Sequence, residues 1–272
     1  LNAATTREYT VFYVRVLDEH LDLALDVVTD LIYQPLITDL EAEKSVVLEE
    51  IAAVEDSPQE LVHDLATQVL FGSHPIGRPI LGDAEVIAGV SQRRLQTFHR
   101  SKYFPSNIAI AATGSIDHDR LVRRVRRLTN DRACNETPKT PMRRSPSDLP
   151  SSCLVFKRKS TEQVHLCISN FGVSSDDPRR YAIGLLDTLL GGSTSSRLFQ
   201  EVREKRGLAY TVYTYGSHYR DTGEFGVYVG TREENLHRCC TVIKEQFYEL
   251  ASGGVGEEEL RRAKENLKGW IV

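Results

Sequence analysis

One order of elements occurs twice in this chain, and this repeat constrains the fold more than any other feature of the sequence. A strand pattern ending near Tyr13 is followed by a long helical pattern and then by a second helix that contains residues 40–44, LEAEK. A strand pattern ending near Tyr228 is followed in the same way by two helices, the second containing residues 260–264, LRRAK. Such repetition is typical of a duplicated scaffold.

Hydrophobic periodicity assigns most of the remaining residues to further strands and helices. The strand patterns cover residues 9–16, 108–113, 153–157, 163–170, 209–218 and 224–231. The helical patterns cover residues 19–33, 39–54, 57–70, 91–103, 117–128, 178–190, 195–205, 233–252 and 257–271. Because several strands are hairpin-like neighbours, we expect an α+β fold of two similar domains, each a mainly antiparallel sheet covered by helices on one face.

Between residues 129 and 152 the helix and strand patterns stop. The stretch is polar and charged, and it contains four prolines, at positions 138, 141, 146 and 150. Proline-rich polar segments are typical of linkers between domains. The sequence therefore predicts an N-terminal domain over residues 1–130, a linker over residues 131–152 and a homologous C-terminal domain over residues 153–272.

The composition disfavours several classes of protein. The formal net charge is −4, whereas nucleic-acid-binding proteins need a basic surface. The five cysteines include no Cys-x-x-Cys pair, so we expect reduced thiols and no disulfide framework. No apolar run reaches the roughly 20 residues that a membrane-spanning helix needs. Both ends of the chain fall inside predicted elements, so we expect a fragment truncated at its start and at its end.

Two glutamates on the predicted helix over residues 39–54 are candidates for metal chemistry. Glu43 and Glu50 are seven residues apart, so they project to nearly the same helix face, two turns apart. Taken alone, a solvated face explains such charges better than a metal site does. The residues around them are unusually apolar, however, and metal ligation is one reason for a carboxylate there. In the repeat, Glu43 matches Ala263 and Glu50 matches Trp270, so the second copy lacks both carboxylates.

Other polar residues leave alternatives open. None of the eight histidines belongs to a His-Glu-x-x-His or His-x-x-Glu-His motif, so the sequence contains no three-ligand zinc site. Residues 191–196, GGSTSS, fit either an anion site at a helix N-terminus or a capped turn. Arg203 and Tyr210 flank a helix-to-strand junction at Gly207 and could donate hydrogen bonds to a substrate carbonyl. A surface arginine and a strand tyrosine are the simpler interpretation.

Taken together, four segments resemble the pitrilysin/insulinase type of metallopeptidase, in its processing-peptidase branch. Residues 1–13 resemble the edge strand that follows the zinc motif of this family, and residues 43–50, EKSVVLEE, resemble its distal metal-ligand helix. Residues 75–82, PIGRPILG, are similar to a loop of the processing peptidases. Residues 190–210 resemble the signature of the second domain. The resemblance covers essentially the whole chain.

The resemblance implies zinc as the cofactor. The family's inverted motif, His-x-x-Glu-His, supplies two zinc ligands and a general base, and a downstream glutamate supplies the third ligand. That third ligand matches Glu50, and Glu43 matches the accessory glutamate that supports the site. The inverted motif is absent here and is expected shortly upstream of Leu1. The chain alone is therefore expected to hold zinc poorly and to be inactive.

The resemblance also assigns residues to the substrate, which would be an extended peptide. Asn2 and Ala3 match edge-strand positions that bind the peptide as an additional strand. Arg203 and Tyr210 match an arginine–tyrosine pair that contacts the substrate and the tetrahedral intermediate. The implied assembly is a homodimer, or a heterodimer with a related subunit, in which this pair would serve the partner's site. The compartment stays open; bacterial cytoplasm is favoured over periplasm and mitochondrial matrix.

The expected function is a zinc-dependent endopeptidase, and two rival functions keep the same fold. One is a non-catalytic partner subunit of a processing-peptidase-like complex, against which the presence of Glu43 and Glu50 argues. The other is a peptide-binding module that uses only the exposed edge strand. The upstream sequence discriminates the first rival, and peptide binding without zinc discriminates the second.

Overall fold

The computed structural model describes residues 1–129 and 153–271, with side-chain environments up to residue 269. It divides into two compact units, each described by itself below. Unit 1 takes residues 1–51 and 80–142, and unit 2 takes residues 52–79 and 143–272. The predicted linker, residues 131–152, lies outside the described residues. The sequence pattern groups residues 52–79 with the N-terminal domain, whereas they cluster with the C-terminal residues; the domain boundaries stay a prediction.

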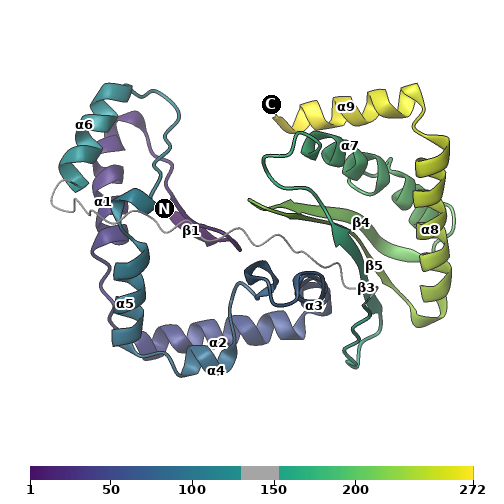
Figure 1. The fold of residues 1–272 in the computed structure, drawn as a ribbon, viewed down its shortest axis with the longest axis horizontal. Helices are drawn as coiled ribbons and strands as arrows, with labels where there is room; N and C mark the ends of the chain where they lie inside the picture. Colours follow the sequence, from purple (N-terminus) through teal and green to yellow (C-terminus); the bar gives the residue numbers. More distant parts are fainter. Residues whose placement is uncertain (130–152, 272) are drawn as a thin grey trace. The chain divides into compact units, whose positions relative to one another are not determined.

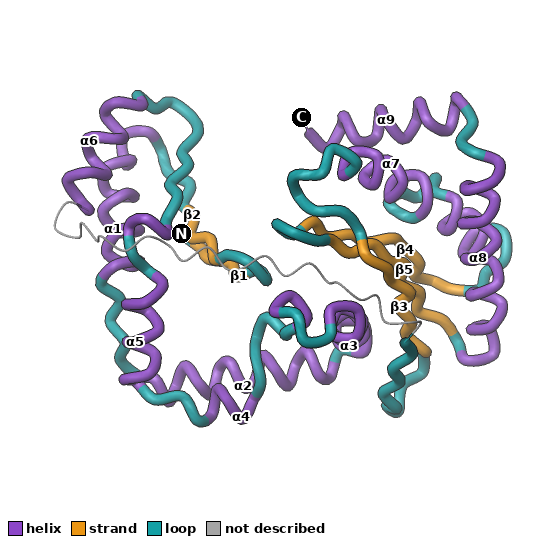
Figure 2. Tube along the Cα trace, viewed as in Figure 1, coloured by secondary structure: helices purple, strands orange, loops and turns teal. Residues whose placement is uncertain are grey.

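Unit 1 is mostly helical (Figures 1 and 2). Its elements are β1 (Asn2–Thr5), β2 (Thr10–Tyr13), α1 (Leu21–Tyr33), most of α2 (Leu40–Asp56), α4 (Ala84–Ala88), α5 (Gln92–Lys102) and α6 (His118–Thr129). β1 and β2 form an antiparallel hairpin. α1 packs beside α6, where Arg120 donates a 3.0 Å hydrogen bond to Asp22. From α5, the ring Nε2 of His99 lies 2.7 Å from the carbonyl oxygen of Ile32.

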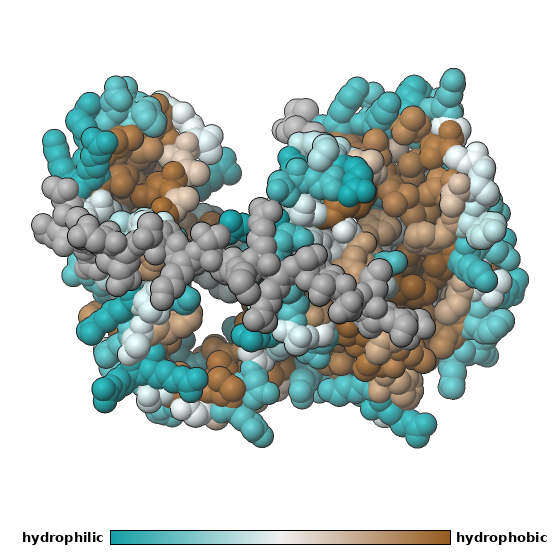
Figure 3. Space-filling view, in the orientation of Figure 1, coloured by the Kyte–Doolittle hydropathy of each residue, from teal (hydrophilic) through white to brown (hydrophobic). Residues whose placement is uncertain are grey.

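Unit 2 is built on a three-stranded antiparallel sheet in the order β3-β5-β4. Its elements are α3 (Pro58–Phe71), β3 (Val164–Phe171), α7 (Arg180–Leu190), a π-helical turn (Phe199–Glu204), β4 (Ala209–His218), β5 (Gly223–Thr231), α8 (Leu236–Gly253) and α9 (Glu257–Ile271). One sheet face packs against α7, the π-turn and α8 around buried Leu190, Val202, Val229 and Ile243. Figure 3 shows hydrophobic residues gathered where α7 and α8 meet the sheet.

The other face of this sheet carries polar and aromatic residues, and α3 packs on it. Alternation along a strand places Cys167, Tyr213 and Tyr228 in one row across the sheet, on the face opposite Val229. α3 begins at Pro58 because Ser57 accepts a capping hydrogen bond from the amide of Glu60. Near its end, the Phe71 and Phe171 rings meet edge to face, with centroids 5.5 Å apart.

The predicted α+β class, with antiparallel sheets and packed helices, is confirmed. The helix from residue 257 and the strand over residues 209–218 have the predicted bounds. Two predicted strands, residues 108–113 and 153–157, were wrong, since neither segment is assigned to a strand. Hydrogen-bonded neighbours define a strand, and neither segment has one among the described residues. In the same described part, no helix is long and apolar enough to span a membrane.

Candidate functional site

In unit 1, β1 lies at the edge of the two-stranded sheet that it forms with β2. Asn2 and Ala3 pair with Tyr13 and Phe12 of β2, and within the described residues this sheet has only those two strands. Both residues are exposed. The side-chain oxygen of Asn2 accepts a 2.8 Å hydrogen bond from the amide of Ala3. The outer side of β1 can therefore take a further strand by main-chain pairing, as edge strands do.

α2 holds the two candidate carboxylates, also in unit 1. The helix begins after Asp39, which has a positive φ of 54° and whose carbonyl accepts hydrogen bonds from the amides of Ala42 and Glu43. Glu43 and Glu50 are both exposed, as the solvated-face interpretation expects. Their neighbour Lys44 is paired instead with Glu41, at 2.8 Å.

The metal implied by the resemblance was tested against these donors. Zinc takes carboxylate oxygen as a ligand, and the exposed carboxylate of Glu50 on a regular helix is accessible for that role. Within the described residues, however, no group of three His, Cys, Asp or Glu side chains could hold a metal ion. The described part of the chain therefore offers one fitting ligand and not a complete zinc site.

Arg203 and Tyr210 are brought together in unit 2. The guanidinium carbon of Arg203 lies 4.4 Å from the centroid of the Tyr210 ring, a cation–π contact. Tyr210 is 73% exposed, and Arg203 is half-buried. These two side chains therefore lie in contact with each other, and their expected contact with substrate stays a prediction.

Two backbone irregularities orient the side chains of Arg203 and Tyr210. Arg203 belongs to the π-helical turn, where the amide of Lys205 bonds the carbonyl of Gln200 five residues back, at 2.9 Å. Tyr210 lies where the β4–β5 register shifts, between Ala209 and Thr211. π-Turns and β-bulges both re-aim side chains and are over-represented near functional sites.

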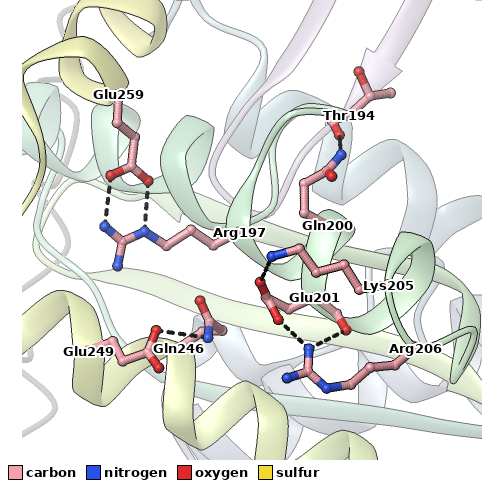
Figure 4. A network of polar contacts seen from close by, with 9 residues as sticks. All are labelled: Thr194, Arg197, Gln200, Glu201, Lys205, Arg206, Gln246, Glu249 and Glu259. Atoms are coloured by element: carbon pink, nitrogen blue, oxygen red, sulfur yellow. Dashed lines mark hydrogen bonds and ion pairs between the residues drawn. The ribbon is translucent and has the colours of Figure 1, made fainter.

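Ion pairs and hydrogen bonds anchor the π-turn on both sides (Figure 4). Glu201 pairs with both Lys205 and Arg206, and these contacts hold the pKa of its carboxyl below the ordinary value. Before the turn, Arg197 forms two 2.7 Å hydrogen bonds to Glu259 of α9, a bidentate pair. The backbone that carries Arg203 is therefore held from both ends.

The Gly-Ser-rich segment, residues 191–196, is a turn that leads into this helix. Gly191 ends α7, and its amide donates to the carbonyl of Asp187 at 2.9 Å. The side chain of Gln200 donates a 2.8 Å hydrogen bond to the carbonyl of Thr194 (Figure 4). These contacts fit a capped turn, which is one of the two alternatives for this segment.

The sequence patterns do not single out one cluster of polar side chains in unit 2, which lies around His63 of α3. His63 Nε2 lies 2.9 Å from the Tyr213 hydroxyl, and Nδ1 lies 3.7 Å from the Cys167 sulfur. Burial lowers the pKa of His63 and raises the pKa of Cys167 to about 12. Cys167 therefore stays a thiol near neutral pH, and the cluster joins α3 to the sheet instead of providing a nucleophile. The available signal was the alternation of Tyr213 and Tyr215 on one strand face.

The six residues expected in the site fall in two groups. Asn2, Ala3, Glu43 and Glu50 belong to unit 1, and Arg203 and Tyr210 belong to unit 2. Within unit 2 the pair is in contact. The expectation that this pair serves the zinc site of a partner subunit stays a prediction.

Comparison with known proteins gives consistent matches along the chain. The family model described as "Insulinase (Peptidase family M16)" matches residues 1–84, and that described as "Peptidase M16 inactive domain" matches residues 89–267. An uncharacterized zinc protease of Streptomyces coelicolor is 39% identical over all of this chain and 61% of its own length. Another, of Bacillus subtilis, is 37% identical over all of this chain and 66% of its own length. The chain thus spans about three fifths to two thirds of these relatives.

Solved structures share the fold. A protease from Helicobacter pylori superposes with a TM-score of 0.86 at 18% identity, over 99% of this chain and 67% of its own. A peptidase M16 inactive domain from Pseudomonas fluorescens superposes with a TM-score of 0.76 at 24% identity, over 93% of this chain and 61% of its own. At these identities the likeness bears on the fold alone.

Proposed function

The chain belongs to the insulinase family of peptidases, family M16, and we propose that the full-length protein is a zinc-dependent endopeptidase that cleaves extended peptides. The observation that carries the proposal is the pair of exposed carboxylates on α2, Glu43 and Glu50. In the second copy, the position that matches Glu43 is Ala263 of α9, which is buried. Exposed glutamates alone fit a solvated helix face. Their place in a segment that matches the insulinase family model, and relatives along the whole chain that are named zinc proteases, favour a metal role.

Each group of residues then has a distinct task. Glu50 would hold zinc as a carboxylate ligand, and Glu43, on the same helix face, would support the site. Zinc, when bound, polarises the scissile carbonyl and lowers the pKa of its water. The remaining ligands and the general base would come from sequence outside these 272 residues.

The substrate tasks belong to β1 and to the Arg203–Tyr210 pair. An extended peptide would pair with β1 at Asn2 and Ala3, which fixes its direction and register. Arg203 and Tyr210 would donate hydrogen bonds to the carbonyl oxygen, where negative charge develops in the transition state. The proposal includes a dimer, with a second copy or a related subunit. A full-length protein that sediments as a monomer would remove the dimer from it.

The test is zinc content and peptide hydrolysis by the full-length protein, with Glu50→Gln beside Glu49→Gln. Glu49 is also exposed on α2 but projects to a different face, so it is a matched control. We expect about one zinc per chain, and a loss of zinc and of more than about 100-fold in rate for Glu50→Gln only. If a well-folded full-length protein holds no zinc and cleaves nothing, the non-catalytic partner-subunit function replaces this one.

A further inference from the structure

We propose that Phe199 is a positioning residue, whose ring holds the Arg203 guanidinium against Tyr210 in the orientation that meets a bound peptide. This inference rests on the proposed function, in which Arg203 and Tyr210 contact the substrate. It adds a third member, on the first residue of the π-turn, to the expected pair.

The contacts place the guanidinium against two aromatic rings. Its carbon lies 4.8 Å from the centroid of Phe199 and 4.4 Å from the centroid of Tyr210. Both distances are within the roughly 6 Å at which a cation is attracted to an aromatic face. Tyr210 is 73% exposed and Phe199 is half-buried, so the inner ring is the fixed one and the outer ring faces solvent.

Phe199 and Arg203 meet because residues four apart share one side of a helix. The hydrogen bond from the amide of Lys205 to the carbonyl of Gln200 then widens this turn to five residues. Gly207, which follows the turn, has a φ of +57°, a conformation typical of the residue after a helix end, and β4 begins at Ala209. The register shift at Tyr210 then exposes that ring on the side where Arg203 lies.

An aromatic ring positions an arginine without occupying its hydrogen-bond donors. Among the described residues, the charged partner of Arg203 is Glu204, whose carboxylate oxygen is 3.7 Å from Nε, beyond a direct hydrogen bond. The guanidinium carries five N–H donors. Glu259 accepts two hydrogen bonds from Arg197, and a carboxylate in the same place beside Arg203 would occupy donors of its guanidinium. Phe199 restrains Arg203 through its face and leaves those donors available to a substrate oxygen.

The first experiment compares Phe199→Leu with Phe199→Tyr in the full-length protein, using a quenched fluorogenic library of extended peptides. Leu keeps bulk but removes the ring face, whereas Tyr keeps it. We expect Phe199→Leu to lower kcat about fivefold with little change in KM, and Phe199→Tyr to retain the wild-type rate. In an Arg203→Ala background, Phe199→Leu should cause no further loss, because it acts through that arginine. Equal rates for the Leu and Tyr variants, or additive losses, would overturn the inference.

The second measurement does not depend on activity. The side-chain NMR signals of Arg203 should be displaced by the ring currents, should move toward ordinary arginine shifts in Phe199→Leu, and should stay in Phe199→Tyr. Unchanged Arg203 signals in Phe199→Leu would sink the inference even if the protein cleaved peptides. If the wild type cleaves nothing while the signals respond as expected, the proposed function fails and the positioning role of Phe199 stands.

Discussion

At Gly191 the chain passes so close to β4 that no side chain fits. A Cβ atom there would meet the backbone nitrogen of Thr214, and would lie 2.8 Å from the Thr214 hydroxyl oxygen. We expect Gly191→Ala to lower the free energy of unfolding by about 2 to 3 kcal/mol, because the clash is with backbone that cannot move aside. Urea unfolding measures it. Gly256→Ala is the control, since nothing lies within 4 Å of its Cβ, and equal stability of the two variants would contradict this explanation.

At the residue scale, sequence reasoning found Arg203 and Tyr210 but not Phe199. The pair matched a family signature, whereas an aromatic residue in a helical pattern is ordinarily a core residue. The difference lies in local geometry: a π-turn and a β-bulge change which side chains meet, and neither has a distinct hydrophobic period. A helical pattern places Phe199 and Arg203 on one side of the helix, and the structure adds the contact between the ring and the guanidinium.

At the scale of elements, we expect the docking of α3 to depend on pH through His63. Burial lowers the pKa of His63 from 6.5 in the folded protein, so the folded state favours the neutral ring, which is packed against Tyr213, Tyr215 and Tyr228. The charge of Asp64 partly opposes this effect, because it raises the pKa of His63. Glu224, buried on β5, acts on the neighbouring Cys167, whose pKa it raises. The neutral ring of His63 therefore contributes to the free energy of unfolding. This contribution is complete above pH 6.5 and is lost as the pH falls below 6.5, because the unfolded chain takes up the proton first.

We therefore expect the free energy of unfolding to drop by up to about 1 kcal/mol more in the wild type than in His63→Gln when the pH falls from about 7.5 to about 5.5. Urea unfolding at several pH values measures this. His237→Gln, an exposed histidine of α8, should keep the wild-type dependence. His165, whose pKa burial also lowers, adds a loss of the same sign that both variants retain. If the free energy of unfolding of His63→Gln changes with pH in parallel with that of the wild type, His63 is not the source of the pH dependence.

Elements with clear local signals were predictable. Ser57 and Ser91 cap α3 and α5, and these helices begin where the sequence placed them. What could not be predicted depends on residues far apart in sequence. The polar face of β3, β4 and β5 makes sense only beside α3, whose His63 meets Tyr213 across 150 positions. The segment over residues 108–113 has strand-like composition but no pairing partner among the described residues, and composition cannot supply one.

At the scale of the whole molecule, the two units differ in how much core they contain. Among the described residues, the buried hydrophobic side chains of unit 1 are Ala24 and Tyr33, whereas one cluster of unit 2 contains eleven buried residues. We expect unit 1 of the 272-residue chain to lose amide protection at lower urea than β4 and β5. Hydrogen exchange followed by mass spectrometry measures both units in one sample. A single transition with equal protection of α1 and β5 would show that the units unfold together.

The place of α3 in sequence has a consequence for the order in which the protein can be made. Unit 2 is assembled from residues 52–79 and from residues after 142, so its two pieces are separated by most of unit 1. During translation, the residues of α3 leave the ribosome well before β3, β4 and β5 are synthesised. Until then, Phe71 and His63 have no sheet to pack against. The nascent chain must therefore carry an amphipathic helix unpaired until the C-terminal half emerges.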